Sequence, residues 1–186
     1  MSTKMTKLVL AVGAMAMAGG AMAANVDASA TATVVVAIQI GKDADLAFGK
    51  FIASPTLAGT VVVPTSGVRV LTNLSQLGGT VSAAAFTVTG TANTTYSISL
   101  PHDIMGMPEM GVELTSTNGG TMPVSAFSAA LVSGGTSTGN SLGVLSSTTN
   151  GALVTQKFKV GATLAVAAAQ APGNYTGTFS VSVDYQ

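Results

Sequence analysis

One short segment of the sequence combines side chains that bind soft metal ions. His102, Met105, Met107 and Met110 fall within nine residues. Thioether sulfur selects Cu(I), and imidazole also binds copper. The segment therefore has the ligands of a copper-holding loop. Methionine also fills irregular gaps beneath loops because its side chain is flexible. We favour that structural role and predict neither a bound metal nor a cofactor.

A second segment matches a hydrolase motif. Residues 139–143 fit the G-x-S-x-G turn that exposes a nucleophilic serine above a parallel sheet. Here Ser141 lies in a region rich in Gly, Ser and Thr, and the chain's single histidine, His102, is the only base available to it. The neighbouring Asp103 is poorly placed to orient that histidine, because adjacent side chains of a strand point apart. We therefore predict no catalytic residue and no enzymatic activity.

The composition excludes further kinds of chemistry and partner. Only 8% of the residues are charged, and the 186-residue chain contains neither cysteine nor tryptophan. Without cysteine there is no disulfide, no thiol nucleophile and no thiolate metal site. The small, balanced charge provides no basic surface for a nucleic acid. The abundance of Val and Thr indicates an all-β structural or surface protein.

Residues 1–23 have the pattern of a signal peptide for export. Lys4 and Lys7 precede an apolar run over residues 8–18, and Ala21-Met22-Ala23 has the small residues of a cleavage site. The apolar run is too short to span a bilayer, which takes about 20 residues. We expect a secreted protein that passes through the periplasm to the cell surface or beyond, without membrane insertion.

The last fourteen residues carry the clearest strand pattern in the chain. Apolar side chains occupy odd positions from Tyr175 to Tyr185, and polar ones occupy the even positions. Because side chains alternate across a strand, one face of this segment is apolar and the other is polar. The segment is therefore expected to be a core strand.

Further strand patterns recur along the chain. Residues 30–40 alternate over a long stretch that Gly41-Lys42-Asp43 is expected to end, and residues 64–67 have the Pro and Gly of a hairpin turn. Gly161 is expected to separate two strands, and the Ala-rich residues 164–170 could form one helical turn. The other strands are expected at residues 46–51, 60–63, 68–71, 81–88, 96–100, 112–115, 122–132, 142–145, 152–160 and 162–167.

This number and spacing of short strands predicts an all-β fold, an immunoglobulin-like Greek-key β-sandwich. No linker separates two cores. We therefore expect one domain over residues 24–186, preceded by the signal peptide.

Four segments resemble an exported bacterial family described as domain of unknown function 4402. They are Leu46-Ala47-Phe48-Gly49 and residues 92–98, 160–164 and 173–179. The ends of the chain are also similar to those of chaperone–usher pilins, including their spore-coat-U-like archaic branch. Such pilins carry a glycine fourteen residues from the C-terminus and a penultimate tyrosine, which the resemblance places at Gly173 and Tyr185.

The pilin resemblance implies a sandwich that lacks one strand and has a groove beside its C-terminal strand. The groove residues it implies are Gly173, Tyr175, Phe179, Val181, Val183 and Tyr185. In pilins, an N-terminal segment of the next subunit fills this groove by strand addition. The donor candidates here lie within residues 30–40, and they are Ala32, Val34, Val36, Ile38 and Ile40.

Two interpretations of residues 30–40 stay open at this stage. As a donor strand, four buried Val or Ile side chains would contribute about 6–12 kcal/mol to assembly. Alternatively, the segment is the first strand of a self-sufficient sandwich.

The sequence thus predicts a structural subunit of a fimbria, or pilus, or of another cell-surface fibre, assembled by strand exchange with copies of itself. A periplasmic chaperone and an outer-membrane usher are further partners that the resemblance implies. One alternative is a monomeric sandwich that binds a surface ligand such as a glycan in cell adhesion, although the chain has few of the aromatic side chains that glycan sites use. A copper-holding periplasmic protein is the other.

Overall fold

The computed structural model describes residues 25–101, 112–133, 135–137 and 142–186. The chain separates into two units, residues 1–33 and 34–186. The described residues of the first unit, 25–33, are exposed and form no regular secondary structure. The second unit consists of antiparallel strands with no helix among its described residues, which confirms the all-β prediction. Accordingly, the described part of the chain has no helix that could cross a membrane.

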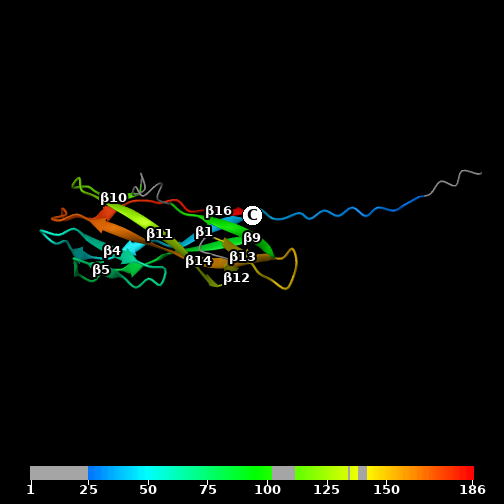
Figure 1. The fold of residues 1–186 in the computed structure, drawn as a ribbon, viewed down its shortest axis with the longest axis horizontal. Coiled ribbons are helices and arrows are strands. Elements are labelled where there is room, and N and C mark those ends of the chain that lie inside the picture. The colour runs from blue at the N-terminus through cyan, green and yellow to red at the C-terminus, as the bar shows by residue number, and fades with distance from the viewer. Residues whose placement is uncertain (1–24, 102–111, 134, 138–141) are drawn as a thin grey trace, which may run out of the picture. The chain divides into compact units, whose positions relative to one another are not determined.

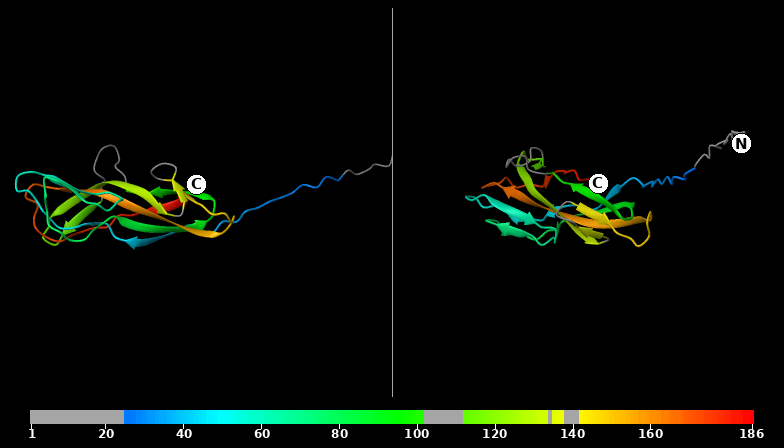
Figure 2. Two further views of the ribbon diagram at one scale, coloured as in Figure 1. Left: turned by 90° about the horizontal axis from the view of Figure 1, so that it is seen from below. Right: turned by 45° about the vertical axis from the view of Figure 1, so that its right-hand side comes forward.

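The larger sheet of the second unit is organised around its longest strand, β14 (Leu153–Val166), shown in orange in Figures 1 and 2. One edge of β14 pairs with β11, and its other edge pairs first with β8 and then with β4. The sheet continues through β1, β5, β10 and β15. The bounds of these strands are β1 (Gln39–Ala44), β4 (Gly59–Val63), β5 (Val70–Thr72), β8 (Ala84–Thr91), β10 (Glu113–Ser116), β11 (Thr121–Ser133) and β15 (Tyr175–Thr176).

A second sheet has the strand order β12-β13-β9-β16, and two further pairs of very short strands join β2 with β7 and β3 with β6. The second sheet comprises β9 (Thr94–Ser99), β12 (Gly135–Ser137), β13 (Leu142–Leu145) and β16 (Ser182–Tyr185). The short pairs comprise β2 (Ala47–Phe48), β3 (Phe51–Ile52), β6 (Ser75–Gln76) and β7 (Val81–Ser82).

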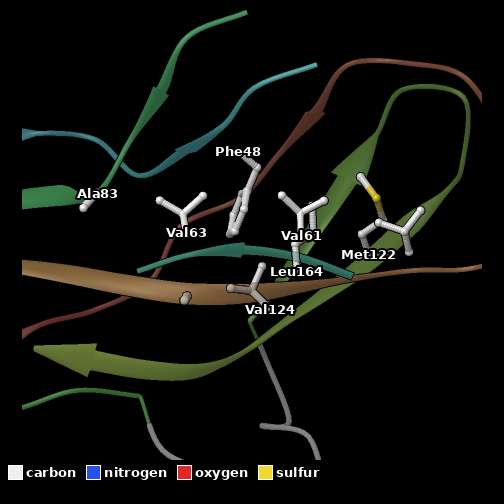
Figure 3. Close-up of a cluster of buried hydrophobic side chains, with 9 residues drawn as sticks. Phe48, Val61, Val63, Ala83, Met122, Val124 and Leu164 are labelled. Carbon is white, nitrogen blue, oxygen red and sulfur yellow. The ribbon is translucent and has the colours of Figure 1, made fainter. Parts of the chain in front are cut away.

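The buried side chains form two clusters. One cluster combines residues of both sheets, so apolar side chains of the two sheets pack together. Its members are Ala84, Phe86, Val88, Tyr96, Ile98, Leu145, Phe158, Val160 and Val183. The other cluster lies where β4, β11 and β14 meet β2, and Figure 3 shows Phe48 of β2 projecting toward Val61, Val63 and Leu164.

The strand β14 corrects the prediction that Gly161 separates two strands. β14 continues as one strand through Gly161, where its partner on one edge changes from β8 to β4, and Val160 and Ala162 on either side are buried. A side chain at residue 161 would collide with the backbone of Val63 and Pro64, at the end of β4. Glycine is therefore required by the close approach of another strand. β14 also extends to Val166, so the helical turn expected over residues 164–170 is not formed.

The prediction of a long strand over residues 30–40 is also wrong. The first regular strand, β1, begins only at Gln39 and pairs with β8, with Ile40 opposite Val88. Residues 41–43, which were expected to end a strand, lie inside β1. Residues 30–37 are exposed and form no strand. The alternating pattern marks a segment able to form a strand, and a ladder also requires a partner edge.

Other local predictions are confirmed. β4 and β5 pair as the hairpin expected around residues 64–67, and the amide of Gly67 donates to the carbonyl of Pro64 at 2.8 Å. β8 and β9 also form, but they belong to different sheets, and Asn93 turns the chain between them with a φ of 60°. The C-terminal segment, by contrast, was expected to be one core strand and forms two short strands in different sheets, β15 and β16, with no strand over residues 177–181. Its pattern of burial is still as predicted, because the apolar side chains at odd positions are at least partly buried and the even positions are exposed.

A buried hydroxyl makes the stability of this fold sensitive to alkaline pH. Tyr96 is fully buried and donates to Gln156 Oε1, and burial raises the pKa of its hydroxyl to about 12. The unfolded chain ionises this group near pH 10, so the folded state holds its proton more tightly between pH 10 and 12. We expect the free energy of unfolding to fall by about 2 kcal/mol across that window, through this group alone.

Urea titrations of the wild type and of Tyr96→Phe at pH 8 to 12 measure this effect. The variant lacks the titrating group, so the stability difference between the two proteins is expected to change above pH 10 and to stay constant below it. A difference that stays constant up to pH 12 would contradict the assignment.

Candidate functional site: an apolar groove beside the C-terminal strand

A cavity of about 1030 Å³ opens in the residue 34–186 unit. Two chain segments, residues 46–53 and 169–179, line much of it, and we call it the apolar groove. The first segment carries β2 and β3, and the second carries β15. Segments from the beginning and the end of the fold thus lie along the same groove.

The side chains that line the apolar groove are almost all uncharged. Lys50 is the one charged residue among the described lining residues. Met122, Val124 and Leu164 are buried members of the cluster in Figure 3 and line the groove from the larger sheet. The other large apolar side chains that line it are Leu46, Phe48, Phe51, Ile52, Leu77, Val112, Leu114, Tyr175 and Phe179. Such a surface suits an apolar occupant and offers little to an ionic one.

The strands that border the groove have a free edge. β2 pairs with β7, β3 pairs with β6, and β15 pairs with β10. Among the described residues, no second strand pairs with β2, β3 or β15. A free strand edge presents backbone N–H and C=O groups that can pair with an added strand. The groove therefore combines an apolar lining with backbone hydrogen-bonding capacity.

Glycines hold the C-terminal segment close to β10. A side chain at Gly173 would collide with Ser116 Oγ, and one at Gly177 would collide with the carbonyl of Glu113. Farther along, the rings of Phe179 and Phe127 pack with their centroids 5.0 Å apart. These contacts give the C-terminal segment a fixed course along one wall of the groove.

Tyr175 is fixed by its hydroxyl. This hydroxyl donates to the carbonyl of Ala171 at 2.7 Å and accepts from Gln170 Nε2 at 2.9 Å. The aromatic ring packs against the cluster that contains Phe48. Tyr175 is thereby held as a rigid part of the groove wall.

The predicted groove residues divide between two places. Gly173, Tyr175 and Phe179 line the apolar groove. Val181, Val183 and Tyr185 lie farther along the chain and belong to, or pack against, the cluster between the two sheets. The C-terminal strand pattern continues across both places because its apolar face meets first one cluster and then the other.

The donor candidates also divide. We call residues 25–37 the N-terminal arm; all of them are exposed and none lies in a strand. Ala32, Val34 and Val36 belong to this arm, and Val34 is 92% exposed. Ile38 and Ile40 are partly buried and pack against the cluster between the sheets of their own unit.

Sequence reasoning did not place the other wall of the groove or its floor. Leu46-Ala47-Phe48-Gly49 stood out as a family-like segment, but nothing local indicated that its strand edge would stay unpaired. The contributions of Val112 and Met122 follow from the pairing of β10 with β11, which is decided by tertiary structure. One local signal of the turn between β2 and β3 is Gly49, whose φ of 74° is a conformation that favours glycine.

The two chemical motifs of the sequence, the candidate copper ligands within residues 102–110 and Ser141, lie outside the described residues. Within the described part of the chain, no group of three or more His, Asp or Glu side chains is placed to hold a metal ion.

Comparison with known proteins gives one match. A family described as domain of unknown function (DUF4402) matches residues 38–185. No curated protein and no solved structure matches the chain. The matched region begins at Ile38, immediately after the N-terminal arm, and contains every described residue that lines the apolar groove.

Proposed function

The chain belongs to this family of unknown function, and the family assigns it no activity. From the apolar groove we propose that the protein is a structural subunit of a fimbria or another cell-surface fibre. In this proposal, the N-terminal arm of one subunit fills the apolar groove of the next. The observation that carries it is an apolar groove bordered by free strand edges, in a chain that also has an exposed arm of small apolar residues.

The length and patterning of the arm suit strand addition. Residues 25–35 are exposed, lie in no strand and span roughly 36 Å when extended, at about 3.3 Å per residue. Within them, the even positions are all apolar: Val26, Ala28, Ala30, Ala32 and Val34. Since alternate side chains of a strand share one face, this face can enter the groove while Asp27 and the Ser and Thr residues face water.

Backbone pairing must supply much of the binding free energy. Two buried valines contribute about 3–6 kcal/mol, and the three alanines add less. This is below the 6–12 kcal/mol expected when Ile38 and Ile40 were counted, because those side chains pack within their own unit. Hydrogen bonds along the free edges of the groove offset the difference, as in other strand-addition complexes.

Strand insertion of this kind leads to a fibre. The arm and the groove are different surfaces, so the contact between two copies is heterologous and need not close into a ring. Each added subunit brings a new groove and a new arm. Before assembly, the open apolar groove is a site for aggregation, so the proposal includes a periplasmic chaperone that covers it and an usher through which the fibre is exported.

Engineered disulfides test this proposal cleanly, because the chain has no cysteine of its own. Thr31 of the arm and Thr178 beside the groove are both exposed, on the polar faces of their segments. We expect Thr31→Cys and Thr178→Cys proteins to form a cross-linked dimer when they are mixed and oxidised, and the double variant to form a ladder on non-reducing gels. Ser29→Cys and Thr33→Cys sample the neighbouring registers.

The matched control places the second cysteine elsewhere. Thr155 of β14 is exposed and does not line the groove. If Thr155→Cys cross-links to the arm as well as Thr178→Cys does, contact is nonspecific and the proposal fails. A double variant that runs only as an internally cross-linked monomer would show that the arm fills its own groove, which excludes exchange between subunits.

A further inference from the structure

Two side chains grip the backbone of Val36, near the end of the N-terminal arm. The hydroxyl of Tyr185 donates to the carbonyl of Val36 at 2.8 Å, and the amide of Val36 donates to Thr91 Oγ1 at 2.8 Å. The amide of Thr91 in turn donates to the hydroxyl of Tyr185 at 2.9 Å. We call these three hydrogen bonds the clasp.

The surroundings of the clasp are built to hold the Tyr185 hydroxyl in place. A side chain at Gly90 would lie 2.5 Å from this hydroxyl and 2.8 Å from Leu145 Cδ1, so glycine leaves the space that the phenol occupies. Thr91 is 4% exposed, and its carbonyl accepts from Thr94 Oγ1 at 2.6 Å. The grip on Val36 involves only its backbone, because its side chain is 52% exposed.

The clasp lies beyond the N-terminal end of the ladder between β1 and β8. The backbone ladder between β1 and β8 ends at the pair Gln39 and Thr89. The clasp holds the chain three residues farther toward the N-terminus, and it uses β16 as well as the end of β8 to do so. A segment that is pulled from its N-terminal side must therefore break the clasp before β1 can separate from β8.

From this geometry we infer that Tyr185 and Thr91 are positioning residues that limit strand exchange to the residues before Val36. This inference rests on the proposed function. The clasp keeps β1, with Ile38 and Ile40, in its own subunit when the arm is held by a second copy. It thereby determines which of the alternating apolar residues are donated and which remain part of the domain.

A cysteine pair across β1 and β8 measures whether β1 stays paired with β8 of its own subunit. Gln39 and Thr89 are opposite each other in the ladder, at a separation suited to a disulfide. In assembled Gln39→Cys/Thr89→Cys protein, oxidation is expected to give bonds within one chain. Adding Tyr185→Phe removes the clasp hydroxyl and keeps the ring. We expect the fraction of chains left without this internal bond to rise about tenfold, because β1 separates from β8 more often, and the Thr91 amide to exchange its hydrogen about tenfold faster.

Two controls separate the possible failures. Ser97→Ala removes a hydroxyl that accepts from Gln186 Nε2, next to Tyr185 but outside the clasp and the apolar groove, and is expected to leave both readouts unchanged. Thr91→Val tests the clasp from its other side should Tyr185→Phe not fold. If Tyr185→Phe and Thr91→Val both match the wild type in both readouts, the clasp inference is overturned while the proposed function stands. If the Thr31→Cys and Thr178→Cys proteins form no intermolecular bond with the clasp intact, the proposed function fails, and this inference fails with it.

Discussion

Replacing Val34 with aspartate is expected to abolish fibre assembly without reducing the stability of the monomer. Val34 is 92% exposed and makes no buried contact in its own subunit, so folding does not depend on it. In the proposed assembly its side chain enters the apolar groove, where a carboxylate would be buried without a partner. Burying an unpaired charge costs several kcal/mol, so we expect assembly to weaken at least about 100-fold. Sedimentation and electron microscopy of the purified protein measure the extent of fibre assembly.

The neighbouring residue provides a matched control for this prediction. Thr33 is also exposed in the arm, but it has the opposite parity and would face water in the assembled fibre. Thr33→Asp places the same charge one residue away and is expected to assemble almost normally. Equal loss of assembly in the two variants would show that the charge acts through general repulsion, and normal assembly of Val34→Asp would contradict insertion of this face into the groove.

Replacing Phe158 with alanine is expected to destabilise the fold by about 3–5 kcal/mol. Phe158 lies on β14, is fully buried, and stacks on Phe86 of the adjacent β8 with ring centroids 5.2 Å apart. Its removal leaves a cavity between the two sheets that the neighbouring strands, held by their ladders, cannot collapse to fill. Urea unfolding followed by circular dichroism measures the change, since the chain has no tryptophan to serve as a fluorescent probe.

Leu153→Ala on the same strand is the control for Phe158→Ala. Leu153 is 63% exposed, so its truncation is expected to change the free energy of unfolding by less than about 0.5 kcal/mol. If the two variants lose similar stability, then the buried cluster between the sheets does not have the importance that the packing indicates.

The sequence predicted the structure best where the burial of a side chain follows from the local alternation of polar and apolar residues. The alternation from Tyr175 to Tyr185 predicted the buried and exposed faces of the C-terminal segment, because each residue's environment there depends only on its parity. The turn at residues 64–67 was predicted from Pro and Gly, whose backbone preferences are local. Gly173 was noticed through the resemblance of the end of the chain to pilins, and its close approach to Ser116 appears only in the structure.

Features that depend on partners distant in sequence were missed. Residues 30–37 carry a strand-like pattern, yet they form no strand. Gly161 suggested a break, whereas it permits β4 to approach β14. The apolar groove depends on which edges of β2, β3 and β15 stay unpaired, and pairing is a property of the whole fold. A local pattern therefore predicts the capacity to form a strand, but not its partner.

The central place of β14 also has a kinetic consequence. Its residues Phe158 and Val160 belong to one buried cluster, and Ala162, Leu164 and Val166 belong to the other. Its partners β4 and β8 precede it by many tens of residues, so loops of that size must close before either cluster is complete. We expect slow, cooperative folding that begins only after most of the chain has been synthesised. A chain that stays unfolded for this long is well suited to being threaded through a narrow export channel before it folds.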